Sequence, residues 1–157
     1  MMSEKRILVA SPIREKPGIL WEYADSLLNL DKEGIKADFL FIDDNEDKES
    51  VRILQRPTQR LPAVLMDGGM KPDAVNSNTK HHVDTIFRVS EYRNRILEFA
   101  REGDYDGLFF VDSDLILHPK TLKHLIQHDK DIISEIYWTR WAPSGPFYPQ
   151  VWRSEEH

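Results

Sequence analysis

Residues 108–119 read Leu-Phe-Phe-Val-Asp-Ser-Asp-Leu-Ile-Leu-His-Pro. The apolar run 108–111 has the length and composition of a strand buried in a parallel sheet. It delivers two carboxylates, Asp112 and Asp114, to the end of that strand, and side chains two apart on extended backbone point the same way. Mg²⁺ is usually held by one or two carboxylates together with phosphates and water. We therefore take Asp112 and Asp114 as candidate ligands of Mg²⁺ or Mn²⁺, the alternative being two solvated acids that close a strand.

Similar strand-like runs occur upstream at 6–10, 37–42 and 63–66 and downstream at 131–137. Apolar spacing predicts helices across 20–28, 46–56 and 83–101, and Pro119 is expected as the first residue of another helix. This alternation predicts an α/β, Rossmann-like fold with helices flanking a mainly parallel sheet of five strands. Ligands bind at the carboxyl ends of such strands. The acids at 43–44 and 112–114 should therefore lie at the same edge of the sheet.

The composition and net charge of the chain argue against several classes of function. The chain has 157 residues, no cysteine and a net charge of −6. The length favours one domain, and the absence of cysteine excludes disulfides and thiolate metal sites. The negative charge argues against a sequence-independent nucleic-acid surface. No apolar run has the length of a transmembrane segment and residues 1–6 do not resemble a signal peptide, so we expect a cytoplasmic protein.

The first two strands also end in groups that suit a nucleotide. Ser11 and Pro12 would allow a ligand to approach the backbone, although an ordinary turn is the simpler explanation. Asp43 and Asp44 could accept hydrogen bonds from a ribose or a base. Adjacent side chains on extended backbone point opposite ways, so at most one of these acids is expected to serve a ligand. An Asx turn or a helix cap explains the pair equally well.

The long helix carries a polar pair of interest. Its apolar face is predicted to consist of Val83, Ile86, Phe87, Ser90 and Leu97. At about 100° per residue, Arg93 and Asn94 fall on or beside this face. A polar pair directed toward the core needs partners, which could be main-chain carbonyls, the strand-end acids or a bound phosphate. An arginine that extends to the edge of the core is the alternative.

The order of these elements resembles that of the family 2-type glycosyltransferases of the GT-A fold. The resemblance runs through residues 7–12, 43–45, 93–94 and 109–114 and continues into 131–138. It implies a single domain over residues 1–157 that binds a nucleoside-diphosphate sugar, of the UDP type by preference, through Mn²⁺ or Mg²⁺. It further implies transfer of the sugar to an acceptor that the sequence does not identify.

The resemblance also implies a role for each candidate residue. Asp112 would face the donor sugar or ribose, and Asp114 would coordinate the metal, which would act as a Lewis acid on the departing diphosphate. Arg93 would approach the nucleotide or its diphosphate. The candidate nucleotide-binding residues are therefore Ser11, Pro12, Asp43, Asp44, Arg93, Asn94 and Asp112, and the candidate metal ligands are Asp112 and Asp114.

The chain departs from the family pattern in one respect. Inverting members carry a catalytic-base carboxylate well after the metal triplet. Here Glu135 falls within the expected fifth strand and Glu155 and Glu156 lie at the end of the chain, so we assign no base. We expect the nucleotide-binding portion without the C-terminal acceptor portion. A non-catalytic nucleotide-sugar binding or interaction domain is the main alternative. A sugar nucleotidyltransferase is a minor one, because residues 11–18 lack the glycine repeats of that class.

Overall fold

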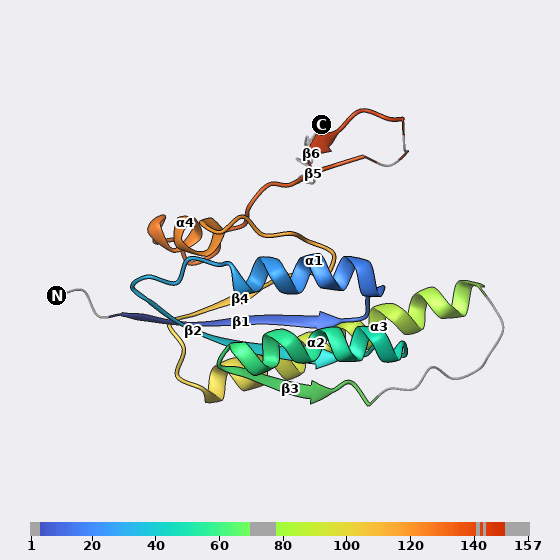
Figure 1. Cartoon of the computed structure of the whole chain (residues 1–157), viewed down its shortest axis with the longest axis horizontal. Coiled ribbons are helices and arrows are strands. Elements are labelled where there is room, and N and C mark those ends of the chain that lie inside the picture. The colour runs from blue at the N-terminus through green and yellow to red at the C-terminus, as the bar shows by residue number, and fades with distance from the viewer. Residues whose placement is uncertain (1–3, 70–77, 141, 143, 150–157) are drawn as a thin grey trace, which may run out of the picture.

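The protein is built on four parallel strands in the order β3-β2-β1-β4, with helices packed on the sheet (Figure 1). The computed structural model describes residues 4–69, 78–140, 142 and 144–149, and the side chains of these except 78–84. The predicted α/β architecture is confirmed at this level. The strands are β1 (Lys5–Ile13), β2 (Ile35–Asp43), β3 (Ala63–Asp67) and β4 (Gly107–Phe110), and the helices are α1 (Pro17–Leu28), α2 (Lys48–Arg60), α3 (Asn78–Glu102) and α4 (Thr121–Gln127). A short antiparallel ribbon, β5 (Trp138–Thr139) with β6 (Tyr148–Pro149), forms a separate sheet.

The alternation of side chains along β1 divides the core into two layers. Ile7 and Val9 belong to the cluster that α1, α2 and α4 complete, and Leu8 and Ala10 belong to the cluster on the opposite face, which α3 completes. Residues 7–10 are thus buried on both faces, which explains their continuous apolar run. The sheet is therefore covered by helices on both sides, as its parallel strands require.

The helices on the first face begin and end at identifiable residues. Pro17 stands at the start of α1, where a missing backbone N–H costs nothing. Asp47 caps α2, since its carboxylate accepts hydrogen bonds from the backbone N–H groups of Glu49 and Ser50. The sequence predicted an end near residue 56, but α2 continues through Pro57 to Arg60.

The predicted fifth strand is wrong. In the described part of the chain the parallel sheet ends at β4, and residues 131–137 form no ladder with it. Ile132 is 94% exposed and Ile136 is 58% exposed. β-branched residues favour a strand only where a neighbouring strand accepts their backbone hydrogen bonds and covers one face.

The expected start of the last helix is also corrected. Pro119 lies in a turn rather than at the first helical residue, and α4 begins at Thr121. The backbone N–H of Thr121 donates to the carbonyl of His118 at 2.9 Å. The Nδ1 atom of His118 accepts a further hydrogen bond from the N–H of Lys120 at 3.2 Å. These bonds close the turn before the helix can begin.

The buried face of α3 differs from the predicted one. Tyr92 and Ile96 are buried, whereas Ile86, Phe87 and Leu97 are 57%, 68% and 50% exposed. The helix is also longer than predicted, because it begins at Asn78 rather than at residue 83. Neither α3 nor any other helix in the described residues is long and apolar enough to cross a membrane.

Candidate functional site

The chain changes direction within the sheet between β1 and β4. From β1 it passes through α1 to β2 on one side, and it returns through α3 to β4 on the other side (Figure 1). The helices that follow β1 and precede β4 cover opposite faces of the sheet. In open α/β sheets, ligands bind in the crevice outside the carboxyl ends of the strands at such a switch point. A ligand site is therefore expected at the carboxyl ends of β1 and β4.

Asp112 lies at this switch point. The N–H of Val111 donates to the carbonyl of Ala10 at 3.0 Å, so the pairing of β4 with β1 extends one residue beyond the strand. Asp112 follows directly, with 59% of its side chain exposed, and its Oδ1 lies 3.5 Å from the Arg93 Nη2 of α3. The pair is loose and open to solvent. Both side chains are consequently free to exchange this contact for a ligand.

The geometry of the Asp-Ser-Asp triplet differs from the expectation. The backbone N–H of Leu115 donates to the carbonyl of Asp112 at 3.2 Å, which places the triplet in a turn rather than on extended backbone. The argument from strand alternation therefore does not apply to Asp112 and Asp114. Asp114 is exposed, and no side-chain hydrogen bond or ion pair reaches it among the described residues.

The donor chemistry of this turn still suits a hard cation. Two exposed carboxylates within three residues match the sparse protein coordination of Mg²⁺, which retains waters and substrate phosphates as its other ligands. Within the described residues, no group of three or more His, Asp or Glu side chains is placed to hold a metal ion. Asp112 and Asp114 could thus hold a cation only together with a ligand, not as a preformed cage.

The two acids after β2 have separate roles. Asp43 Oδ1 accepts hydrogen bonds from the backbone N–H of Asn45 at 3.0 Å and from its Nδ2 at 2.8 Å, which is the Asx turn considered above. Asp44 instead faces α3. Its Oδ1 accepts the hydroxyl of Tyr92 at 2.8 Å, and its Oδ2 lies 3.3 Å from the Nη1 of Arg88.

Asp44 is the centre of a nearly buried charge network. Only 11% of its side chain and 12% of the Arg88 side chain are exposed. The Nη1 of Arg14, in the loop after β1, lies 3.5 Å from Asp44 Oδ2, and its Nη2 lies 2.8 Å from Glu46 Oε1. Burial, followed by the hydrogen bond to Asp44, raises the pKa of Tyr92 to about 12. Tyr92 therefore remains a hydrogen-bond donor at neutral pH.

A single face of α3 holds the ends of β2 and β3. Arg88 and Tyr92 reach Asp44, and Arg95 donates to the backbone carbonyls of Asp67 and Gly68 at 2.9 and 3.1 Å. The sequence pattern did not indicate these three residues, because the buried face was placed mainly by the apolar residues of the helix. Positions 88, 92, 95 and 96 follow the helical repeat of 3.6 residues. This repeat is visible only if Arg88, Tyr92 and Arg95 are assigned to the buried face together with Ile96.

The remaining candidates lie apart from these contacts. Ser11 is fully buried and its hydroxyl shares a hydrogen bond with the Tyr23 hydroxyl of α1, while Pro12 is half-buried. Burial raises the pKa of Tyr23 above its ordinary value. Asn94 is exposed and Arg93 is half-exposed, so neither side chain points into the core, and the partner of Arg93 is Asp112, one of the strand-end acids considered above. The structure thus brings together Arg93 and Asp112, but it places Ser11 in the core.

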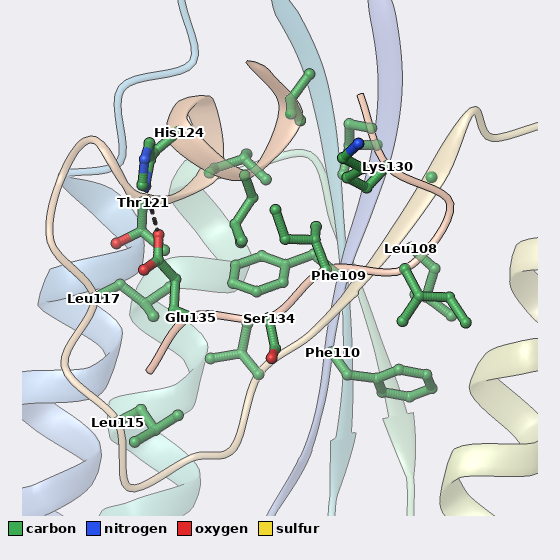
Figure 2. Close-up of a pocket in the computed structure, with 18 of the residues that line it drawn as sticks. Leu108, Phe109, Phe110, Leu115, Leu117, Thr121, His124, Lys130, Ser134 and Glu135 are labelled. Atoms are coloured by element: carbon green, nitrogen blue, oxygen red, sulfur yellow. Dashed lines mark hydrogen bonds and ion pairs between the residues drawn. The ribbon is translucent and has the colours of Figure 1, made fainter. Parts of the chain in front are cut away.

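An open cavity of about 1240 Å³ extends from the switch point along β4. Arg93 and Asp112 are among its lining residues. Figure 2 shows the apolar side chains that line it from β4 and from the loop that follows. The segment 129–137 crosses its other side, where Glu135 pairs with His124 of α4. Glu155 and Glu156, considered as bases above, lie outside the described residues. The candidate site therefore combines charged groups at the strand ends with an apolar cleft beside β4.

Comparison of the chain with models of protein families gives no match, and comparison with curated proteins finds no relative.

Proposed function

We propose that this chain is a glycosyltransferase-like domain that binds a nucleoside-diphosphate sugar with a divalent cation and transfers the sugar to an acceptor hydroxyl. The observation that carries the proposal is the position of Asp112. This carboxylate stands at the switch point of a parallel sheet, beside the Arg93 guanidinium and two residues before Asp114. A diphosphate needs a positively charged partner and its cation needs a negatively charged one. The exposed Arg93 and Asp112 have these charges.

Asp112 and Asp114 would hold Mn²⁺ or Mg²⁺, and the cation would stabilise the negative charge of the departing nucleoside diphosphate. Arg93 would contact a phosphate oxygen. Its present contact with Asp112 is 3.5 Å long and half-exposed, so little free energy opposes its exchange. The nearest apolar surface is the cleft along β4, where a sugar or an acceptor could lie.

The nucleoside would lie nearer β2. A carboxylate accepts about four hydrogen bonds. Oδ1 of Asp43 accepts two, both from Asn45. Asp44 accepts hydrogen bonds from Tyr92 and Arg88 and also lies 3.5 Å from the Nη1 of Arg14, and with 11% of its side chain exposed it has little room for a further donor. Arg14 is 46% exposed at the same place and adds positive charge. Oδ2 of Asp43 accepts no hydrogen bond from the described residues, so these contacts favour Asp43 over the nearly buried Asp44 as the nucleoside contact.

A non-catalytic nucleotide-sugar binding domain is the second candidate. The orientation of Glu135, away from the switch point, favours this candidate. A positioned base typically contributes about 10²–10⁴-fold to the transfer step. Glu135 follows the Asp turn along the chain, but its Oε1 is 2.9 Å from the Nδ1 of His124 rather than directed at the switch point. Under this second candidate the donor binds and the sugar is not transferred.

Incubation with radiolabelled nucleotide sugars, Mn²⁺ and a panel of acceptors separates the two functions. Glycosylated product that requires Mn²⁺ and is lost in Asp114→Ala supports the transferase. Donor that is retained on the protein without product supports the binding domain. Failure to retain or convert any donor with Mn²⁺ present contradicts both. Glu22→Ala, which removes an exposed carboxylate of α1, is the control.

A further inference from the structure

Two histidines lie at the C-terminal end of α4, beside the cleft that Asp112 also lines but away from the Asp112–Arg93 pair. His124 and His128 are one helical turn apart, and their Nε2 atoms are 3.1 Å from each other. The two rings meet edge to face with their centroids 4.8 Å apart. Residues four apart on a helix face the same way, so both imidazoles are exposed on one side of α4.

Glu135, in the segment that follows the helix, contacts one of the two histidines. Its Oε1 lies 2.9 Å from the Nδ1 of His124, as the dashed line in Figure 2 shows. A carboxylate on Nδ1 holds the proton there, which leaves the Nε2 lone pair of the neutral ring available. Histidines that bind metals almost always have such a partner on their other nitrogen.

We propose that His124 and His128 bind a borderline transition-metal ion such as Zn²⁺ through their two Nε2 atoms, with Glu135 as the orienting group. Two nitrogens at about 2.0–2.1 Å from one tetrahedral Zn²⁺ are about 3.3–3.4 Å apart. The Nε2 atoms are 3.1 Å apart and need to separate only slightly. Glu135 does not converge on the same point, so the protein supplies two ligands and water completes the coordination.

Imidazole ligands select the metal. Neutral imidazole suits Zn²⁺, Cu²⁺ and Ni²⁺, whereas Mg²⁺ and Mn²⁺ prefer carboxylate oxygens and water. The position also differs from that of Asp112. Asp129, next to His128, pairs with Lys5 at the first residue of β1, whereas Asp112 follows the carboxyl end of β4. The two ion positions therefore border the same cleft toward opposite ends of the sheet, and their donor atoms favour different ions, so binding of Zn²⁺ and of Mn²⁺ can be tested separately.

Titration of the whole chain with ZnCl₂, followed by calorimetry and by NMR of the imidazole nitrogens, tests this site. We expect Zn²⁺ to shift the Nε2 resonances of His124 and His128 and to leave those of His118 unchanged. His128→Ala should weaken binding by at least tenfold, and Glu135→Gln by about 10–100-fold, as for other orienting groups. Circular dichroism checks that each variant is folded.

The controls decide the assignment among the six histidines. His118→Ala, His157→Ala and the double substitution His81→Ala/His82→Ala should bind Zn²⁺ as the original chain does. Zn²⁺ binding that survives in His124→Ala and His128→Ala would overturn the proposal. The same holds if the histidine pair 81–82 proves to be required, or if Zn²⁺ does not bind at all. In those cases the contact between His124 and His128 is only a shared hydrogen bond.

Discussion

The hydroxyl of Tyr92 donates a 2.8 Å hydrogen bond to Oδ1 of Asp44 and thereby joins the middle of α3 to the end of β2. Arg88, one turn earlier on α3, approaches the other oxygen of the same carboxylate at 3.3 Å. The helix that precedes β4 is thus held against the strand-end loops of the other half of the sheet. Because Arg93 is on the same helix, the position of the Arg93–Asp112 pair depends on this connection.

Asp44 should matter for stability far more than Asp112. Removal of one partner of a buried ion pair leaves the other charge unpaired, and we expect Asp44→Ala to lower the free energy of unfolding by about 3 kcal/mol, the low end for buried pairs. Asp112→Ala removes a half-exposed contact and should cost about 1 kcal/mol or less. Urea denaturation of the two variants checks this, and equal losses would contradict the network.

The free energy of unfolding should fall as the pH rises above 10. The pKa of Tyr92 is raised to about 12 in the folded protein, so between about pH 10 and 12 the folded state keeps a proton that the unfolded state loses. The contribution is complete below pH 10 and decreases by up to about 1.4 kcal/mol per pH unit in that window. Tyr92→Phe should reduce this slope in denaturation series across the window. A slope unchanged by Tyr92→Phe would argue against the raised pKa.

Gly68 leaves no room for a side chain beside this network. A Cβ at Gly68 would lie 2.7 Å from the Tyr92 hydroxyl oxygen and 3.0 Å from the carbonyl oxygen of Asp43. Gly68→Ala should therefore displace Tyr92 and destabilise the protein by about 1–3 kcal/mol. A Cβ at Gly18 in α1 would have no atom of the described residues within 4 Å, so Gly18→Ala should be neutral or stabilising by up to about 1 kcal/mol. Thermal denaturation should show a clear loss for the first variant and none for the second, and equal losses would contradict the close approach at Gly68.

The strands could be predicted from the sequence where burial on both faces produces a continuous apolar run. This holds for residues 7–10 of β1 and for 39–42 of β2, and parallel pairing followed from the alternation with helices. The segment 131–137 contains similar residues but has no strand beside it to bond with among the residues that the structure describes. Composition predicts the preference for a strand, whereas pairing depends on the rest of the fold.

The candidate site was predictable in position but not in detail. The alternation of strands and helices predicted that the acids after β2 and β4 lie at the same edge of the sheet, and Asp44 and Asp112 do so. The partners of Asp44 were not foreseen, because Arg88 and Tyr92 occupy the buried face of α3 while apolar Phe87 is exposed. Burial of an arginine is unfavourable unless a carboxylate pairs with it. The carboxylate that pairs with Arg88 lies outside α3, so the periodicity of this helix alone does not predict the pair.

The measurement that bears most directly on the proposed site is calorimetric titration with UDP in the presence and absence of Mn²⁺. We expect binding with Mn²⁺, much weaker binding without it, and loss of most of this difference in Asp114→Ala, since a sparse carboxylate site then loses one of its ligands. Glu22→Ala should behave as the unsubstituted chain. Equal affinity for UDP with and without Mn²⁺, or an Mn²⁺ effect that persists in Asp114→Ala, would contradict the account.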